Sequence, residues 1–131
     1  MAFEGDGPSR SAIITLIDGV TFNNTTTASN SNAQDCYSYR YFLLYLNIDS
    51  TNAPTDIQFL IQYSDDGGTT WYDYRQGLFA SLFYEDTVVA AGILECFSGE
   101  VMGRTIRLRV VATGTTSTAT FLVTAKIEFR S

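Results

Sequence analysis

Histidine is absent from this chain of 131 residues. Catalytic couples that join a serine or cysteine to an imidazole base cannot form, and neither can imidazole-based metal sites. Basic residues are also few: seven arginines and one lysine stand against 14 acidic residues, for a net charge of −6. No basic field is available to neutralise phosphates, so we expect no nucleic-acid partner.

Cysteine is scarce as well. Cys36 and Cys96 are the two in the chain, and they lie 60 residues apart. Two cysteines are too few for a four-ligand zinc site or for a disulfide framework. Pairing of the two is not fixed by spacing, and we expect two buried thiols in preference to a disulfide. We expect no metal and no cofactor.

Long apolar runs are missing too. The longest are Tyr41–Leu46 and Val88–Leu94, far short of the roughly 20 residues that span a bilayer. Residues 1–10 are acidic where a signal peptide needs positive charge, and no apolar h-region of a signal peptide follows them. We therefore expect a flexible leader over residues 1–10, no membrane partner, and synthesis in a cytoplasm.

Aromatic and hydroxyl side chains dominate instead. The chain is 45% hydrophobic with 18 aromatic residues, 17 threonines and 11 serines, and only 17% of it is charged. This balance is typical of half-buried strands rather than of surface helices. The length fits one core, so we predict a single domain over residues 1–131.

Alternating apolar and polar residues predict where the strands lie. The clearest runs are Asp56–Ser64, Arg104–Thr113 and Thr118–Phe129, and we predict that the last two form a C-terminal hairpin around Gly114. Asp18-Gly19 is likewise predicted to be the turn of a first hairpin.

Three further segments complete the prediction. Residues 37–48 are apolar on both faces, which indicates a central strand, and residues 87–97 indicate another strand, whereas 78–84 fit a strand or a helical turn. Residues 23–35 contain no large apolar side chain, so we predict an exposed polar loop. The sum is an all-β fold: an antiparallel two-sheet β-sandwich, jelly-roll or Ig-like, with seven to eight strands.

One short string is specific. Residues 64–71 read SDDGGTTW and match the Asp-box-like pattern S-x-D-x-G-x-T-W through Ser64, Asp66, Gly68, Thr70 and Trp71. We interpret it as a turn stabiliser, in which glycines adopt the turn and the aspartate accepts amide hydrogen bonds. A direct ligand site is the alternative, as is a calcium cluster of Asp65, Asp66 and Asp73.

Other residues are candidates for an interface. Tyr37, Tyr39 and Tyr41 alternate along one predicted strand face together with Tyr45, and such a row packs in a core, joins subunits or stacks on sugars. Arg107 and Arg109 share a strand face from which they can pair with acids. The remaining candidates lie in the polar loop and are Asn23 and Asn24.

The order of these segments resembles a group of small tailed-phage virion proteins. The resemblance rests on IQFLIQYSDDGGTTWYDY (Ile57–Tyr74), an apolar strand ending near Phe97, and GRTIRLRVVATGTTSTATFLVTAKIEF (Gly103–Phe129). It implies a virion structural protein, most simply a capsid decoration or cement protein on the capsid surface, which is synthesised in the host bacterial cytoplasm. It also implies that the partner is the major capsid protein and that the protein is a homo-oligomer, a dimer or trimer.

Two other classes stay open. A carbohydrate-binding module of a phage fibre or head would bind polysaccharide through exposed tyrosines or Trp71. A head-tail connector or other tail component would form a ring. We expect no enzyme, because catalysis would need carboxylate pairs that the sequence does not single out.

Overall fold

The computed structural model of the chain describes residues 10–74, 82–86 and 92–131. It describes the side chains of all of these residues except 82–86. These residues form strands and no helix, so none of them provides a helix able to span a membrane. The strands are β1 (Ile14–Phe22), β2 (Ala28–Asn30), β3 (Gln34–Asp35), β4 (Tyr41–Thr51), β5 (Asp56–Ser64), β6 (Tyr72–Asp73), β7 (Leu82–Asp86), β8 (Ile93–Glu100), β9 (Thr105–Thr113) and β10 (Thr120–Arg130).

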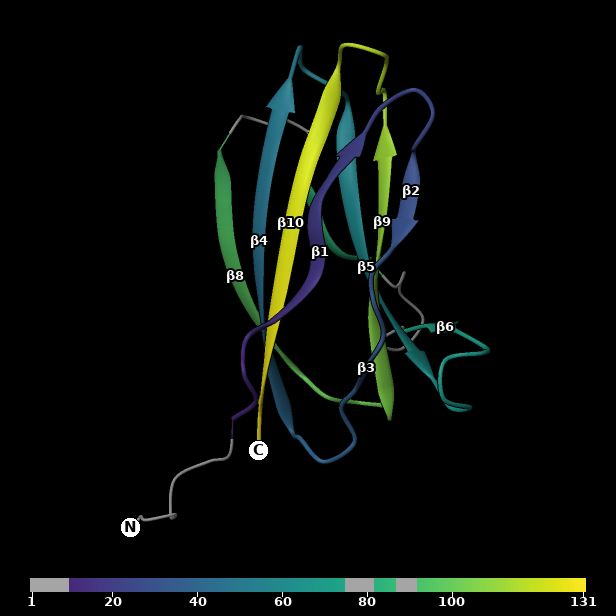
Figure 1. Ribbon diagram of the computed structural model, residues 1–131, viewed down its shortest axis with the longest axis vertical. Helices are drawn as coiled ribbons and strands as arrows, with labels where there is room; N and C mark the ends of the chain where they lie inside the picture. The colour runs from purple at the N-terminus through teal and green to yellow at the C-terminus, as the bar shows by residue number, and fades with distance from the viewer. Residues whose placement is uncertain (1–9, 75–81, 87–91) are drawn as a thin grey trace.

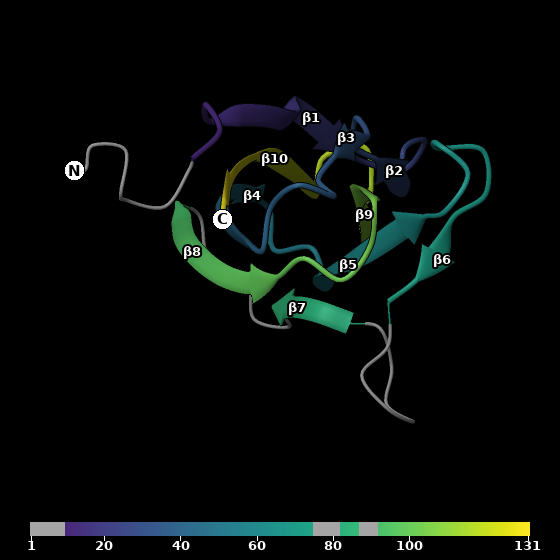
Figure 2. The ribbon, with the colours of Figure 1, turned by 90° about the horizontal axis from the view of Figure 1, so that it is seen from below.

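Two antiparallel sheets lie face to face (Figures 1 and 2). One has the order β1-β10-β4-β8. In the other, β9 pairs with β5, both β2 and β3 pair with β9, and both β6 and β7 pair with β5. If β2 with β3 and β6 with β7 each count as one interrupted strand, the ten strands reduce to eight, four in each sheet. Their interleaved order is that of a jelly roll, so the predicted β-sandwich is confirmed.

The core lies between the sheets and is made by alternate residues of the long strands. The inward sides predicted for the last two long strands are buried, as are those of β4 and β5. Each large side chain withdrawn from water contributes about 1.5–3 kcal/mol. The largest fully buried side chains are Phe22, Phe59, Phe121, Phe129, Leu44, Ile48, Ile57, Ile106, Leu108, Ile127, Val110 and Val123.

The predicted C-terminal hairpin is wrong in its pairing. Both strands exist, but β9 pairs with β5 while β10 pairs with β4 and β1, so the turn at Gly114 crosses from one sheet to the other. Gly114 has φ +74°, and a Cβ there would lie 2.8 Å from the backbone nitrogen of Thr55. A turn residue indicates a change of direction, but it does not say in which sheet the next strand lies.

The predicted first hairpin is also wrong. Asp18-Gly19 lies inside β1, which pairs with β10 on both sides of this dipeptide. Ile17 faces Ala125 and Val20 faces Val123, so β1 has one residue more than β10 over this interval. Gly19, with φ +61°, therefore adopts a β-bulge and not a tight turn.

The polar segment 23–35 is only partly a loop. It contains β2 and β3, and Ala28 faces Val111 while Gln34 faces Ile106 on β9. Ladder hydrogen bonds use backbone groups, so a strand at a sheet edge needs no large apolar side chain. The absence of apolar residues therefore predicted exposure but not backbone conformation.

The central strand is confirmed with a later start. β4 lies between β10 and β8, but it begins at Tyr41, so residues 37–40 precede it. The strand predicted over 87–97 corresponds to β8, and the ambiguous 78–84 segment overlaps β7. Residues 1–9, 75–81 and 87–91, which include most of the predicted leader, lie outside the described residues.

The expectation for the cysteines is half right. Both thiols are free, but Cys36 is buried and Cys96 is exposed. Cys96 faces Tyr45 across the β4–β8 ladder, so it lies on the outer side of its sheet.

Candidate functional site

The Asp-box-like turn joins β5 to β6 and is held by its own hydrogen bonds. The Ser64 hydroxyl donates to Asp66 Oδ1 at 2.8 Å and accepts the Gly68 N–H at 2.8 Å. Asp66 Oδ1 also accepts the backbone N–H groups of Thr69 at 3.0 Å and Thr70 at 2.8 Å. The bonds from Thr70, then Ser64 and Thr69, hold the pKa of Asp66 well below its usual value. These contacts fix the shape of the turn.

Trp71 closes the same turn and connects it to the neighbouring sheet face. Its indole Nε1–H donates to the Gly68 carbonyl oxygen at 3.0 Å. The Arg107 guanidinium carbon lies 4.3 Å from the indole ring centroid, a cation–π contact. Arg107 Nε also donates to Gln62 Oε1 at 2.7 Å, and Gln62 Nε2 donates to Asp73 Oδ1 at 2.7 Å. The outer side of β9, β5 and β6 thus carries one continuous polar network.

Arg109 belongs to this surface as well. Its Nη1 donates to Asn30 Oδ1 on β2 at 2.9 Å. Burial lowers the pKa of Arg107, the charge of Arg109 adds to this effect, and Asp73 opposes it. We call this surface the arginine face; it comprises Asn30, Gln62, Trp71, Asp73, Arg107 and Arg109. Its polar groups are paired with one another inside the chain.

The predicted tyrosine row does not lie on one surface. Tyr37, 70% exposed, lies in the turn before β4, whereas Tyr39 is half-buried and stacks on Phe129 with ring centroids 5.4 Å apart. Tyr41 is exposed and begins β4. The prediction that these tyrosines share one face was wrong because residues 37–40 are not part of β4.

Asn23 and Asn24 lie in the turn after β1, away from the tyrosines. Asn23 Oδ1 accepts the backbone N–H groups of Thr25 and Thr26, both at 2.9 Å, so Asn23 shapes the turn after β1. Asn24 is exposed in the same turn. The candidate interface residues are therefore spread over several surfaces, although Trp71 and Arg107, which come from different elements, are in direct contact.

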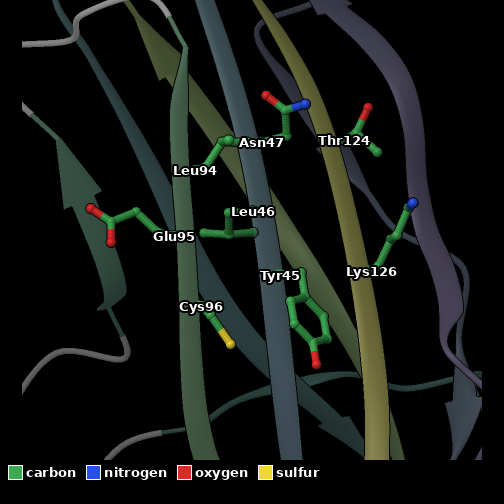
Figure 3. Close-up of a pocket in the computed structure, with 8 residues that line it drawn as sticks. All are labelled: Tyr45, Leu46, Asn47, Leu94, Glu95, Cys96, Thr124 and Lys126. Atoms are coloured by element: carbon green, nitrogen blue, oxygen red, sulfur yellow. The ribbon is translucent and has the colours of Figure 1, made fainter.

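A different surface combines exposed apolar groups. On the outer side of β10, β4 and β8, Leu94 is 75% exposed and Leu122 is 42% exposed. Leu94 faces Asn47 and Leu122 faces Asp49 on β4, whereas Tyr41 is exposed on the same side at the other end of that strand. A groove of about 360 Å³ crosses these three strands (Figure 3). It is lined by Tyr45, Leu46, Asn47, Leu94, Glu95, Cys96, Thr124 and Lys126.

Strand register explains how the groove forms. Lys126 on β10 faces Tyr45 on β4, and Tyr45 faces Cys96 on β8, so these side chains form one row across the sheet (Figure 3). Asn47 and Leu94 form the next row. We call this surface the groove face; it comprises Tyr41, Tyr45, Leu94, Cys96, Leu122 and Lys126. Large contiguous apolar patches on soluble proteins mark interaction sites.

Sequence reasoning missed most of the groove face. Of its members, only Tyr41 was a candidate interface residue, although Tyr45 was in the predicted row. The alternation of residues along the last strand places Leu122 and Lys126 on its outer side, so the sequence did contain a signal for these two residues. Leu94 and Cys96 lie in a run without a clear period, so their orientation was not predictable.

The alternative of a calcium cluster is not supported by the geometry. Asp66 accepts amides within its turn, Asp73 pairs with Gln62, and Asp65 lines a separate cavity. Among the described residues, no three histidine, cysteine, aspartate or glutamate side chains gather as a metal site would require.

The comparisons with known proteins identify the fold but not the family. No family model and no curated protein sequence matches the chain. Among solved structures, a chain of infectious bursal disease virus, Gx strain, aligns over 96% of this chain with a TM-score of 0.59 and 12% identity. The VP2 subviral particle of the same virus aligns over 95% with a TM-score of 0.53 and 13% identity.

These alignments cover only part of the other proteins. The chain spans about a third of the viral chains, 32% and 33% of their lengths. A CBM4 structure also aligns over 90% of this chain and 68% of its own length at 16% identity, but with a TM-score of 0.43. At 12% and 13% identity, what the viral chains share with this protein is an all-β sandwich fold.

Proposed function

We propose that this protein is a structural component of a virus particle, a decoration or cement protein of a tailed-phage head. It docks on the major capsid protein through the groove face and bridges neighbouring capsid subunits. The observation that carries the proposal is the exposure of Leu94 at the groove, with Leu122 exposed on the same side of the sheet. The location that follows is the outer surface of the virion.

The fold and the sequence both support this assignment. Jelly rolls recur in viral capsid proteins and in lectin domains. The viral chains that align with this protein have the same kind of fold. The resemblance to small tailed-phage virion proteins covers β5, the β5–β6 turn, the part of β8 up to Phe97, β9 and β10. The absence of histidine excludes imidazole-based metal chemistry from the same fold.

The chemistry of the groove face suits a protein partner. Aliphatic and aromatic side chains supply the buried centre of most interfaces, and polar groups form the rim. Here Leu94 and Tyr45 flank the groove, while Asn47 and Lys126 supply hydrogen-bond donors at its sides. Many copies on one head need only weak single contacts, because multivalent attachment of a dimer or trimer multiplies them.

Co-sedimentation with phage heads tests the proposal. The purified chain is titrated onto heads of the phage that encodes it, purified without this protein, and the bound copies are counted. We expect saturation at a fixed copy number set by capsid symmetry, and light scattering on the free protein should give a dimer or trimer. Absence of head binding would contradict the proposal, and a closed ring in solution would favour the connector.

A further inference from the structure

A second cavity lies at one end of the sandwich, away from the groove face. Its volume is about 250 Å³. The end of β3, the β5–β6 turn and the start of β9 meet there, at the end of the molecule where the C-terminus also lies (Figure 1). The cavity is lined by Asp35, Tyr37, Asp65, Gly67, Arg104 and Thr105.

Tyr37 supplies an aromatic surface at this cavity. The side chain is 70% exposed, unlike the half-buried Tyr39 two residues later. The Arg104 guanidinium carbon lies 5.9 Å from the Tyr37 ring centroid, so one side of the ring is associated with a cation. The exposure leaves most of the ring open to a ligand. A flat apolar ring beside hydrogen-bonding groups is what stacking against a sugar requires.

The charged groups of the cavity have unused hydrogen-bonding capacity. Asp35 accepts one hydrogen bond, from the Thr105 hydroxyl at 3.2 Å. Within the part of the chain that the structure describes, neither Asp35 nor Asp65 forms an ion pair with Arg104, although all three line the same space. Two carboxylates offer acceptors and one guanidinium offers donors. Vicinal hydroxyl groups, which both donate and accept, complement this set.

The backbone holds these groups in place. Asp35 ends β3, which is paired to β9 through Asp35 and Thr105. Asp65 and Gly67 lie in the turn that Ser64 and Asp66 fix through hydrogen bonds. Gly67 has φ +78°, a conformation that favours glycine. A turn that is already ordered loses little entropy when a ligand binds.

We propose that this end cavity binds a neutral saccharide, with one sugar ring stacked on Tyr37 and its hydroxyl groups bonded to Asp35, Asp65 and Arg104. Two carboxylates against one guanidinium leave the cavity net negative, and the ionised Asp66 lies next to Asp65 in the turn. Uronic acids, sialic acids and phosphates are therefore disfavoured by like charge. The volume lies just below the range of about 300–1,000 Å³ for small-molecule sites, which suits a single ring of a longer chain.

This site is separate from the proposed docking surface. The residues that line the end cavity and those that line the groove do not overlap. A copy that is bound to a head through the groove face keeps its end cavity available to a glycan. The two proposals can therefore fail independently.

Nuclear magnetic resonance titration of the ¹⁵N-labelled full chain tests the site. The probes are xylohexaose, cellohexaose, maltohexaose and chitohexaose, with hexagalacturonate as the acidic comparison, each up to about 10 mM, which detects millimolar dissociation constants. We expect at least one neutral probe to shift the amides of Tyr37, Arg104 and residues 65–67 saturably, and hexagalacturonate to leave them unchanged.

Paired variants separate the site from other tyrosines. Tyr37→Ala should lower the affinity of the bound probe at least about tenfold, since stacking on the ring is lost. Tyr41→Ala, which removes another exposed tyrosine on the groove face, should leave that affinity unchanged. Tyr37→Ala should also leave head co-sedimentation unchanged, which distinguishes this site from the docking surface.

Four results would overturn the proposal. They are no shift with any neutral probe, tighter binding of hexagalacturonate, saturable shifts that cluster around Trp71, and calcium chloride alone shifting the cavity amides in place of a sugar. These results would mean, in turn, that the cavity binds no neutral saccharide, that it prefers an acidic one, that the sugar binds at Trp71, or that the cavity binds a cation.

Discussion

The two outer faces of the sandwich use their side chains in opposite ways. On the arginine face, Arg107 donates to Gln62 and lies over Trp71, and Arg109 donates to Asn30. On the groove face, Leu94 is exposed at a groove of about 360 Å³, and Leu122 and Tyr41 are exposed elsewhere on the same side of the sheet. Tryptophan and arginine are the residue types most enriched at binding hot spots, yet here they bind each other. A docking surface is therefore better identified by what the fold leaves exposed than by residue type.

The largest expected difference between the faces is in thiol reactivity. Burial, with a smaller contribution from the charge of Asp35, raises the pKa of Cys36 to about 12, whereas Cys96 is exposed in the groove. The thiolate is the reactive form, so at pH 8 a maleimide should modify Cys96 at least about 1,000-fold faster than Cys36. Mass spectrometry of the native protein measures both rates. Equal rates would mean that Cys36 is not packed as described.

The same reagent reports on docking. A bulky maleimide on Cys96 should block head binding, because the label fills the groove. Cys96→Ser provides the control: it should bind heads normally and should not respond to the reagent. Retained binding of the labelled wild-type protein would place the docking surface elsewhere.

Charging the groove face is expected to have the next largest effect. The double substitution Leu94→Asp with Leu122→Asp should weaken head binding at least about 30-fold, which corresponds to a hot-spot loss of about 2 kcal/mol. Leu122 faces Asp49 on β4, so its replacement by aspartate places two carboxylates opposite each other. Since aspartate is also disfavoured in strands, the free energy of unfolding should fall by about 1–2 kcal/mol. Sedimentation isotherms and urea denaturation measure the two quantities.

Met102→Asp, which adds one carboxylate where the double variant adds two, is the control for added charge. Met102 is also an exposed apolar side chain, 58% exposed, but it lies outside the groove face. It should reduce neither head binding nor stability appreciably. If Met102→Asp weakened head binding as much as the double variant, the effect would be one of charge alone and not of docking.

Substitutions on the arginine face should act on stability and not on docking. Arg107→Ala removes the hydrogen bond to Gln62, which is only 7% exposed. Leaving a buried amide oxygen without its donor costs about 1–3 kcal/mol. Arg109→Ala, whose bond to Asn30 is exposed, should cost less than about 1 kcal/mol. A folded Arg107→Ala protein that no longer bound heads would reverse the assignment of the two faces.

The smallest expected effect is the pH dependence that Asp66 brings to the β5–β6 turn. Its pKa is lowered in the folded protein, first by the Thr70 hydrogen bonds, from about 3.9 in an unfolded chain. Its contribution to stability is therefore present above about pH 4 and declines as the pH falls toward the folded pKa. Urea midpoints between pH 2 and 6 should fall less steeply for Asp66→Asn than for the wild type. Parallel curves would show that this carboxylate is not bonded in solution.

Much of the fold was predictable from the sequence, because burial imposes a strict period on long strands. Val110 and Val123 were placed correctly on inward faces, and the positions of most long strands along the chain were predicted correctly. Pairing was not predictable: Gly114 suggested a hairpin, whereas the chain crosses between sheets there. Which strands become neighbours depends on contacts between residues far apart in sequence, and a single turn does not report them.

The candidate site was less predictable for the same reason. The Ser64–Trp71 string is local, so its hydrogen bonds followed from its residue types. The Arg107–Gln62 bond depends on the β5–β9 register, and the Tyr45–Cys96 row depends on the β4–β8 register. Neither register can be predicted from a local sequence pattern. Tyr37 is not part of the predicted tyrosine row because β4 begins four residues later, at Tyr41.

Cryo-electron microscopy of heads saturated with the purified protein tests the central claim most directly. The orientation of the jelly roll in the map shows which surface meets the capsid. We predict that β10, β4 and β8 lie against the major capsid protein, with Leu94 and Leu122 in the contact, and that the arginine face points to solvent. A map in which the arginine face meets the capsid, or one with no density for this protein on the head, would contradict the account.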